Sequence, residues 1–241
     1  MCLKAENPKM ICTELLKEMR NGLFSQCKKL PRETVLSEKL GISRTQLRDV
    51  LSDFEREGFI TRRHGVGTII NRHVLEVKSR MDIETEFLDI IRQNGHEATI
   101  SFIQVTERIA DGMIAQKLHI EEGTPVICIR LLCNADDRPA IYSEDVLEKH
   151  LVKADYRSQD FKLSIFQFLE KFCDVEPYMD LTELHPVLAD EKLSKILQVS
   201  KGSPLLNMEE VDYDIEGNPI FYSKQYFVDR FFKHTVLRKK F

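Results

Sequence analysis

Arg44 and Arg48 are the residues of this sequence best suited to recognise another molecule, because they lie four positions apart in a segment with helical periodicity. Four residues span about one helical turn, so the two side chains project from the same face of the helix. A guanidinium group can donate two parallel hydrogen bonds, either to O6 and N7 of guanine or to a phosphate. The pair therefore indicates a nucleic-acid interface; the alternative is an ordinary solvated helix face.

Two short helices joined by a tight turn are predicted around these arginines. The first runs from about Arg32 to Leu40 and ends at Gly41, since glycine readily adopts the left-handed conformation that closes a helix. Ser43 begins the second helix, and Gln46 three residues later completes a capping box. Apolar residues recur at positions i, i+3, i+4 and i+7 and predict the buried face of this helix, formed by Leu47, Val50, Leu51 and Phe54.

A basic hairpin is predicted directly after the second helix. Residues 59–63 and 68–70 have the composition of two strands that flank a turn. Gly65 and Gly67 lack side chains and allow the tip of the hairpin to approach another backbone closely. His64 and the two arginines before it add positive charge, so the hairpin has the character of a wing beside the helix pair.

The charge of the chain is divided unevenly between its two parts. The net charge of the 241 residues is −4, but residues 1–78 hold 15 Lys and Arg against 10 Asp and Glu, a net charge of +5. Residues 79–241 have the opposite sign, with a net charge of −9. Because the length suits two domains of roughly 100–150 residues each, we expect a basic head that faces phosphates and an acidic body.

Several classes of function leave no trace in the sequence. It contains no Gly-rich phosphate loop, no Gly-x-Ser-x-Gly motif and no His-x-x-x-His or His-Glu-x-x-His pattern. The six cysteines lack Cys-x-x-Cys spacing, which favours reduced packing residues over disulfides or metal ligands. No apolar run reaches the roughly 18 residues that span a bilayer, and the N-terminus has no signal-peptide pattern. We therefore expect a cytoplasmic protein without a cofactor, a metal site or a membrane partner.

The segment from residue 30 to residue 70 resembles the winged helix-turn-helix domain of the GntR family of bacterial transcription regulators. The resemblance rests on Leu-Pro at residues 30–31, Leu-Gly-Ile-Ser-Arg-Thr-Gln-Leu-Arg at 40–48, Glu-Gly at 57–58 and Gly-Val-Gly-Thr at 65–68. It implies a double-stranded DNA interface formed by Arg32, Ser43, Arg44, Thr45, Gln46, Arg48, His64, Gly65 and Gly67. Arg32 substitutes there for a family arginine at the position that Thr34 occupies in this chain.

The rest of the chain is predicted to be an α+β domain built on an antiparallel sheet. Two hairpins are expected around the turns at residues 136–139 and 214–218. Long hairpins with helices between them favour an antiparallel sheet. The periodicity and capping residues predict these helices at residues 81–94, 111–118, 163–172 and 190–197.

These landmarks resemble the UTRA effector domain of the HutC subfamily, whose fold is similar to that of chorismate lyase. The resemblance covers about residues 80–235 and rests on Gly-Thr-Pro-Val at residues 123–126, Ser-Ile-Phe at 164–166 and Gly-Asn-Pro at 217–219. It implies a winged helix-turn-helix domain at residues 1–71, a linker at 72–82, and an effector-binding and dimerisation domain at 83–241.

The same resemblance implies an effector site formed by Arg130, Glu144, Ser164, Phe166 and Tyr226. Leu132, Phe166 and Ile220 depart from the family pattern, because they replace an arginine, a tyrosine and a glutamate. A phosphosugar needs such partners, since each buried polar group without one costs about 1–3 kcal/mol. We therefore expect a smaller or more apolar anion held by Arg130. The alternative role of Arg130 is a structural ion pair with Glu144.

Together the two resemblances imply a homodimeric bacterial regulator that binds a palindromic operator and responds to a small-molecule effector. It is expected to be a repressor, and an activator is the alternative. The alternative is a chorismate-lyase-like enzyme that acts on a small acid and is fused to a DNA-binding module. The sequence offers no nucleophile–base pair and no metal-ligand spacing for such an enzyme, and similarity of fold does not establish function.

Overall fold

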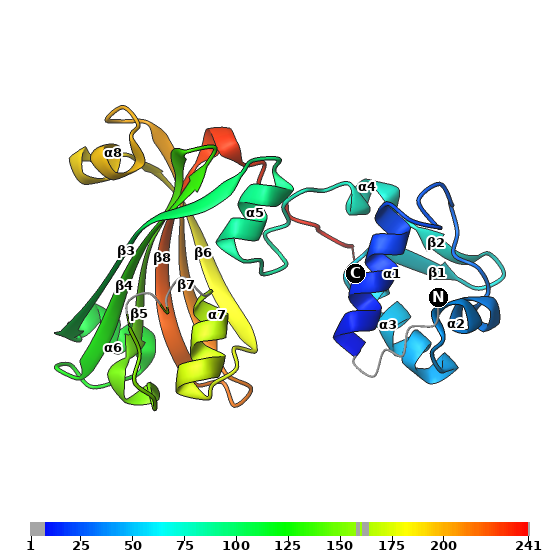
Figure 1. The fold of residues 1–241 in the computed structure, drawn as a ribbon, viewed down its shortest axis with the longest axis horizontal. Coiled ribbons are helices and arrows are strands. Elements are labelled where there is room, and N and C mark those ends of the chain that lie inside the picture. The colour runs from blue at the N-terminus through cyan, green and yellow to red at the C-terminus, as the bar shows by residue number, and fades with distance from the viewer. Residues whose placement is uncertain (1–7, 158–159, 161–163, 241) are drawn as a thin grey trace. The chain divides into compact units, whose positions relative to one another are not determined.

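The chain forms two compact units in the computed structural model, which describes residues 8–157, 160 and 164–240 (Figure 1). The first unit comprises Met1–Ile83 and Thr235–Phe241, and the second comprises Glu84–His234. The predicted linker therefore belongs to the first unit. Residues 235–241 also belong to the first unit, whereas they were predicted to be part of the effector-binding domain.

The described part of the first unit contains four helices and a two-stranded sheet. The strands pair antiparallel, with Ile60 opposite Ile70 and Arg63 opposite Gly67. The core consists of apolar side chains from the helices, the strands and the segments between them, such as the fully buried Leu15 on the first helix and Ile60 on the first strand. The elements are α1 (Pro8–Arg20), α2 (Glu33–Leu40), α3 (Arg44–Arg56), β1 (Ile60–Arg63), β2 (Gly67–Ile70) and α4 (Arg72–Leu75). The predicted helix pair and hairpin are confirmed, and residues 1–7 lie outside the described part of the chain.

The C-terminal segment packs against the end of α3 within this unit. The Lys239 ammonium group donates hydrogen bonds to the carbonyl oxygens of Glu55 and Arg56 at 2.6 and 2.5 Å. A cation interacts favourably with the unpaired carbonyl groups at the C-terminal end of a helix. Leu237 packs against the core beside Gly58, where an added Cβ atom would lie 2.5 Å from the Leu237 side chain. The last turn of α3 is therefore held by a segment that follows the second unit in the sequence.

The second unit is built on one six-stranded antiparallel sheet with the strand order β3-β4-β5-β8-β7-β6. This agrees with the predicted α+β class and with both predicted hairpins. The strands are β3 (Ala98–Ile109), β4 (Pro125–Ala135), β5 (Arg138–Glu148), β6 (Met179–Leu188), β7 (Pro204–Tyr213) and β8 (Pro219–Val228).

The sheet is made of two similar halves. The first half runs β3, α6 (Gly112–Leu118), β4 and β5, and the second runs β6, α8 (Glu191–Leu197), β7 and β8. Asp111 and Asp190 cap the two helices by accepting hydrogen bonds from main-chain N–H groups three residues later. The halves join where β5 pairs with β8. Ala-Asp at residues 110–111 and 189–190 marks this repeat in the sequence, but it was not predicted.

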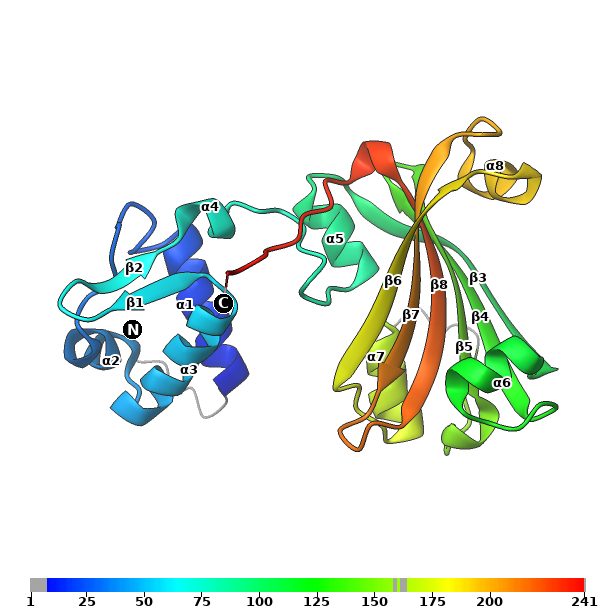
Figure 2. The ribbon, with the colours of Figure 1, turned by 180° about the vertical axis from the view of Figure 1, so that it is seen from behind.

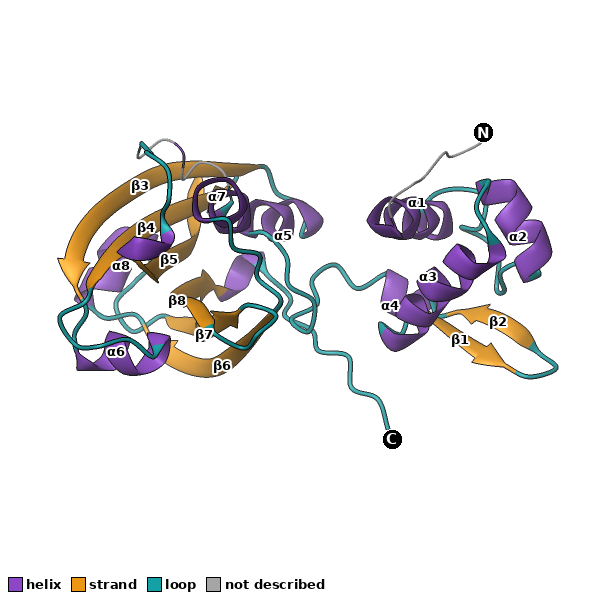
Figure 3. Cartoon of the chain, turned by 90° about the horizontal axis from the view of Figure 1, so that it is seen from below, coloured by secondary structure: helices purple, strands orange, loops and turns teal. Residues whose placement is uncertain are grey.

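Two pairs of helices cover opposite faces of the sheet (Figures 2 and 3). On the first face, called the α6/α8 face, α6 packs against Val126 and Tyr222, and α8 packs against Tyr142. On the second face, called the α5/α7 face, α5 (Phe87–Gln93) and α7 (Ile165–Phe168) cover the sheet. α7 continues as a π-helical turn, Leu169–Cys173, and Leu163, where this helix was predicted to begin, lies outside the described residues.

The helix predicted at residues 81–94 begins later than expected, at Phe87. The Met81 N–H group donates a hydrogen bond to the Thr235 carbonyl oxygen at 2.9 Å, and the Leu237 N–H group donates one to Asp82 at 3.3 Å. Residues 81–82 are thus bonded to the C-terminal segment instead of to a helix. The chain between them and α5 includes Glu84, which is exposed.

Candidate DNA interface and effector site

A satisfied cap fixes the start of α3. Ser43 Oγ accepts a hydrogen bond from the Gln46 main-chain N–H group at 3.2 Å, and the Ser43 N–H group donates one to Gln46 Oε1 at 3.0 Å. The preceding turn closes through Gly41, which has a φ of 68° in the left-handed region. The predicted capping box is confirmed. The Ser43 and Gln46 side chains thus bond to each other, and their predicted contact with DNA remains a prediction.

The orientation of α3 follows from its apolar face. The four residues predicted to be buried are at most 3% exposed. Arg44, Thr45 and Arg48 are exposed on the other side of the helix. The structure therefore brings together the residues expected to contact bases, on a helix that the core holds in a fixed rotation.

Arg48 is positioned by α2. Its Nε atom lies 2.8 Å from Glu33 Oε2, and its side chain is still 58% exposed. This contact uses one donor of the guanidinium group and leaves the others for a ligand. Arg32, the residue immediately before α2, is exposed, so the structure leaves it available for the predicted contact.

The wing carries exposed basic residues and an open tip. Gly65 and Gly67 have φ values of 74° and 100°, which favour glycine. No atom lies within 4 Å of where a Cβ atom would be on either glycine, so another molecule can approach the tip. His64 at the tip is exposed. Arg62, by contrast, binds Glu55 at 2.7 Å, which directs its charge toward α3.

The residues before α2 extend the wing on its other edge. The Leu30 N–H group donates a hydrogen bond to the Thr68 carbonyl oxygen at 2.9 Å. Lys29 Nζ donates one to the Val66 carbonyl oxygen at 3.0 Å, next to the tip. Lys28 and Lys29 are exposed. The segment thus adds basic groups beside the wing, a contribution that sequence motifs did not assign.

Arg130, the central residue of the predicted effector site, makes an ion pair. Its Nε atom lies 3.2 Å from Glu144 Oε1, and its Nη1 atom donates to Gln104 at 3.2 Å. Glu144 also accepts hydrogen bonds from Tyr142 and Lys192 at 2.7 and 2.8 Å. Burial raises the pKa of Glu144, but the hydrogen bonds from Lys192 and Tyr142 outweigh it, so the pKa is lowered overall. The ion pair considered as the alternative for Arg130 is present.

The five predicted effector residues are divided between the two faces of the sheet. Arg130 and Glu144 are opposite each other in the pairing of β4 with β5, and Tyr226 stacks on Tyr142 on the same α6/α8 face. Phe166 packs against the Phe221 ring on the α5/α7 face, at a centroid distance of 6.3 Å. The structure therefore does not bring the five side chains together.

The remaining predicted effector residue and the off-pattern positions have structural roles. Ser164 Oγ accepts a hydrogen bond from the Gln167 N–H group at 3.1 Å and caps α7. Leu132 packs in the apolar cluster that contains Tyr142, and Ile220 is buried in the cluster beneath α7. The departures from the family pattern thus replace polar groups with packed apolar ones.

A polar centre that the sequence analysis missed lies on the α5/α7 face. Asp145 accepts hydrogen bonds from Ser143 and Ser223 at 3.2 and 2.5 Å, and Gln225 donates to Ser223 at 3.1 Å. All four residues are buried. Burial raises the pKa of Asp145 to about 6, although both hydroxyl groups act in the opposite direction. The sequence did contain a signal for this centre, because these polar residues are two positions apart on each of β5 and β8. Residues with that spacing on a strand lie on the same face of the sheet.

Two family descriptions match the chain at these two units. "Bacterial regulatory proteins, gntR family" matches residues 8–70, and "UTRA domain" matches residues 93–233. The chain belongs to the gntR family and carries a UTRA domain. It is a transcription regulator of the HutC type. Because the family and its relatives are regulators, nothing supports the enzyme alternative.

Named relatives agree with this assignment, and a solved structure has the same fold. The histidine utilization repressor of Pseudomonas putida is 26% identical over 195 residues, which are 80% of this chain and 76% of that protein. The HTH-type transcriptional repressor NagR of Bacillus subtilis is 24% identical over 230 residues, 95% of this chain and 93% of that protein. The crystal structure of the possible regulator YydK from Bacillus subtilis, 19% identical, has a TM-score of 0.77 and covers 96% of this chain and 100% of that one.

A second solved structure shows the same fold. PhnF from Mycobacterium smegmatis, at 16% identity, has a TM-score of 0.59 and covers 95% of this chain and 99% of that one. In the part of the chain that the structure describes, no helix has the length and apolar character needed to span a membrane.

We expect Arg48→Ala to weaken binding to a DNA site by about 1–3 kcal/mol and to relax base preference there, because a bidentate arginine–base contact is lost. Fluorescence anisotropy with a site selected from random duplexes measures both effects. Arg56→Ala is a matched control on the same helix, since Arg56 is 72% exposed and pairs with Asp53 at the opposite end. Unchanged affinity and specificity in Arg48→Ala would remove Arg48 from the interface.

We also expect DNA affinity to fall steeply with salt, because the basic residues of α3 and the wing displace counterions from phosphates. Four phosphate contacts would reduce affinity about a hundredfold between roughly 50 and 200 mM salt. Gel-shift titrations across this range measure the slope. A flat response would mean that the basic groups do not contact the backbone.

Proposed function

We propose that this regulator is a homodimeric repressor of the bacterial cytoplasm that binds a palindromic operator and is released by a small-molecule effector bound to the UTRA domain. The observation that carries the DNA part is the capped helix α3, which presents Arg44 and Arg48 in exposed positions beside an open basic wing. Each protomer would insert α3 into a major groove and place its wing along the adjacent backbone.

An exposed apolar edge of the sheet supports dimerisation. β6 is the last strand of the sheet and pairs with β7 alone. Such edges and apolar patches are suited to association with another chain. A two-fold axis would then present two copies of α3 to an inverted repeat. Five large side chains on or beside β6 are between 46% and 69% exposed: Tyr178, Met179, Leu181, Leu184 and Leu188.

The sign of regulation is inferred from relatives. Two of the proteins similar to this chain are named repressors, the histidine utilization repressor and NagR. Release of a repressor requires an effector that favours the DNA-free arrangement, since a ligand shifts an equilibrium only by its difference in affinity for the two states.

A small organic anion bound by Arg130 is the effector hypothesis that follows from the sequence. The Arg130 side chain is 46% exposed, so an anion can reach it. The ion pair with Glu144 competes with such an anion, because a bound carboxylate has to share or take over the guanidinium donors. The hypothesis therefore requires that Glu144 releases Arg130 when the anion binds. Glu144 would then keep its ion pair with Lys192, which lies 2.8 Å away.

Selection of bound duplexes from a random DNA pool tests the proposed function. We expect inverted repeats to be enriched, with half-sites about one helical turn apart or less. Sedimentation velocity should show a dimer, and Leu181→Lys should shift it toward monomer and reduce affinity for the repeat. Ile215→Lys is the control, because Ile215 is 76% exposed at the tip of the β7–β8 hairpin. Enrichment of single half-sites by a monomer would refute the dimer.

Arg130→Ala tests the effector hypothesis. We expect this variant to bind the operator normally and to lose the release produced by a small carboxylate that is first identified in a thermal-shift screen. Arg138→Ala is the matched control, because Arg138 is exposed at the start of β5. If release persists in Arg130→Ala, Arg130 serves only its ion pair with Glu144.

A further inference from the structure

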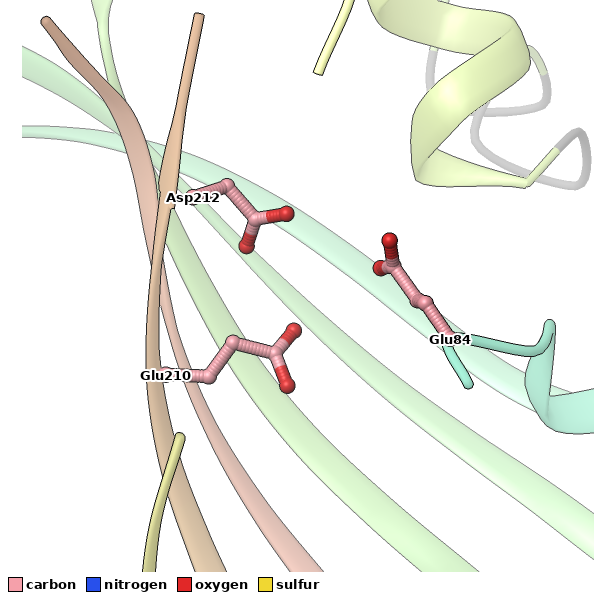
Figure 4. Close-up of side chains that lie close together, drawn as sticks. All are labelled: Glu84, Glu210 and Asp212. Atoms are coloured by element: carbon pink, nitrogen blue, oxygen red, sulfur yellow. The ribbon is translucent and has the colours of Figure 1, made fainter. Parts of the chain in front are cut away.

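Three carboxylates converge on the α5/α7 face, outside the predicted effector residues (Figure 4). Glu210 and Asp212 are two positions apart on β7 and therefore project from the same face of the sheet. Glu84 approaches them from the segment before α5. One carboxylate oxygen from each residue lies within 4.8 Å of the other two.

Asp212 is buried and has no hydrogen-bond partner in the described part of the chain. Its side chain has an exposed fraction of 0%, and neither of its carboxylate oxygens accepts a hydrogen bond in the described structure. Buried polar groups are nearly always paired, because an unpaired buried charge is costly. Both oxygens belong to the group that faces Glu84 and Glu210. Asp212 is therefore a buried acceptor that no side chain or main-chain group of the described residues satisfies.

The surroundings of the three carboxylates add further negative charge. Asp180 is opposite Asp212 in the pairing of β6 with β7, and Asp145 also acts on Asp212. Burial first, and then the neighbouring carboxylates, raise the pKa values of Glu210 and Asp212 above the ordinary range of a carboxyl group. A proton or another cation is needed to relieve this repulsion.

Carboxylates on the α6/α8 face of the same sheet form ion pairs with lysine side chains. Glu209 binds Lys224 at 2.7 Å, and Glu144 binds Lys192 at 2.8 Å. Among the described residues, no lysine or arginine forms an ion pair with Glu84, Glu210 or Asp212. Lysine side chains thus compensate the charges of Glu209 and Glu144, whereas the described residues supply no such ion pair to this cluster.

We propose that Glu84, Glu210 and Asp212 form a binding site for a cation, supplied by a divalent metal ion or by the ammonium group of a small amine. Oxygens bound to one Ca²⁺ or Mn²⁺ ion at about 2.2–2.5 Å are separated by at most about 5 Å. Oxygens that accept hydrogen bonds of about 2.8 Å from one ammonium group are separated by about 4.5 Å. The spacing of the cluster accommodates either cation, and an all-oxygen set without Cys or His favours hard metals over zinc or copper.

The position of Glu84 suggests that cation binding affects regulation. This part of the inference rests on the proposed function. Glu84 is the first residue of the second unit and directly follows the chain that leaves the DNA-binding unit. A cation shared by Glu84 and β7 would fix this chain to the sheet. Binding of the cation would therefore be linked to operator affinity if the two arrangements of the chain differ in affinity for DNA.

The site is tested first without DNA, on the full-length protein after treatment with EDTA. Thermal unfolding and isothermal titration calorimetry are followed with MnCl₂, MgCl₂ and CaCl₂ in one arm, and with putrescine and spermidine in the other. We expect one arm to raise the midpoint of unfolding by at least about 2 °C at saturation, since a ligand specific to the folded state stabilises it.

Neutral variants connect the response to the cluster. Glu210→Gln, Asp212→Asn and Glu84→Gln should each weaken cation binding at least tenfold, and the first two should unfold at a higher temperature than the wild type without ligand, because repulsion is removed. Glu209→Gln is the matched control, since Glu209 lies on the same strand but faces Lys224. A fold defect would lower stability instead, and exposed Glu84 provides a variant that does not disturb the core.

The outcomes separate the site from the proposed function. Binding of a metal or an amine that the variants lose supports the site and identifies its ligand class. Absence of binding in both arms, or equal binding by the wild type and all three variants, overturns the site even if the operator still responds to another effector. If the cation binds but leaves operator affinity unchanged, the site stands and its regulatory consequence is refuted.

Discussion

The alternation of side chains along the strands of the six-stranded sheet is the constraint on which the effector domain depends. Successive residues face opposite sides of the sheet. The pairing of β5 with β8 therefore determines which of the two faces each residue of these strands occupies. Glu144 therefore faces α8, where Arg130 and Lys192 neutralise it, while its neighbour Asp145 faces α7 among serine hydroxyl groups. The two faces thus differ in charge although they share the same strands.

The repeat within the sheet explains why polar groups meet at its centre. Ser143 and Ser223 occupy equivalent places in the two halves. Ser143 reaches Asp145 from two positions earlier on β5, and the central pairing places Ser223 opposite Asp145. On the α6/α8 face, Glu144 and Glu209 form ion pairs with partly exposed lysines. The α5/α7 face is covered by apolar clusters, and burial there raises the pKa values of Glu210 and Asp212.

Two passages of the chain join the effector unit to the DNA-binding unit, at Ile83–Glu84 and at His234–Thr235. They lie together, because the Met81 N–H group bonds to the Thr235 carbonyl oxygen. The second passage continues to Lys239, which binds the final carbonyl groups of α3. The recognition helix is therefore held at its first turn by its own cap and at its last turn by a segment that comes from β8. A ligand that favours one arrangement of these passages can alter DNA binding through them.

The sequence alone determined the DNA-binding unit almost completely, because its signals are local. Gly41, Ser43 and Gln46 specify a turn and a cap within six residues, and the apolar spacing of α3 orients Arg44 and Arg48. It also determined the class of the second unit and the presence of both hairpins. Only the tertiary structure decided which face each residue of the sheet occupies, where α5 begins and where the C-terminal segment packs. These depend on strand register and on contacts between residues more than 150 positions apart, such as Asp82 with Leu237, which local patterns do not encode.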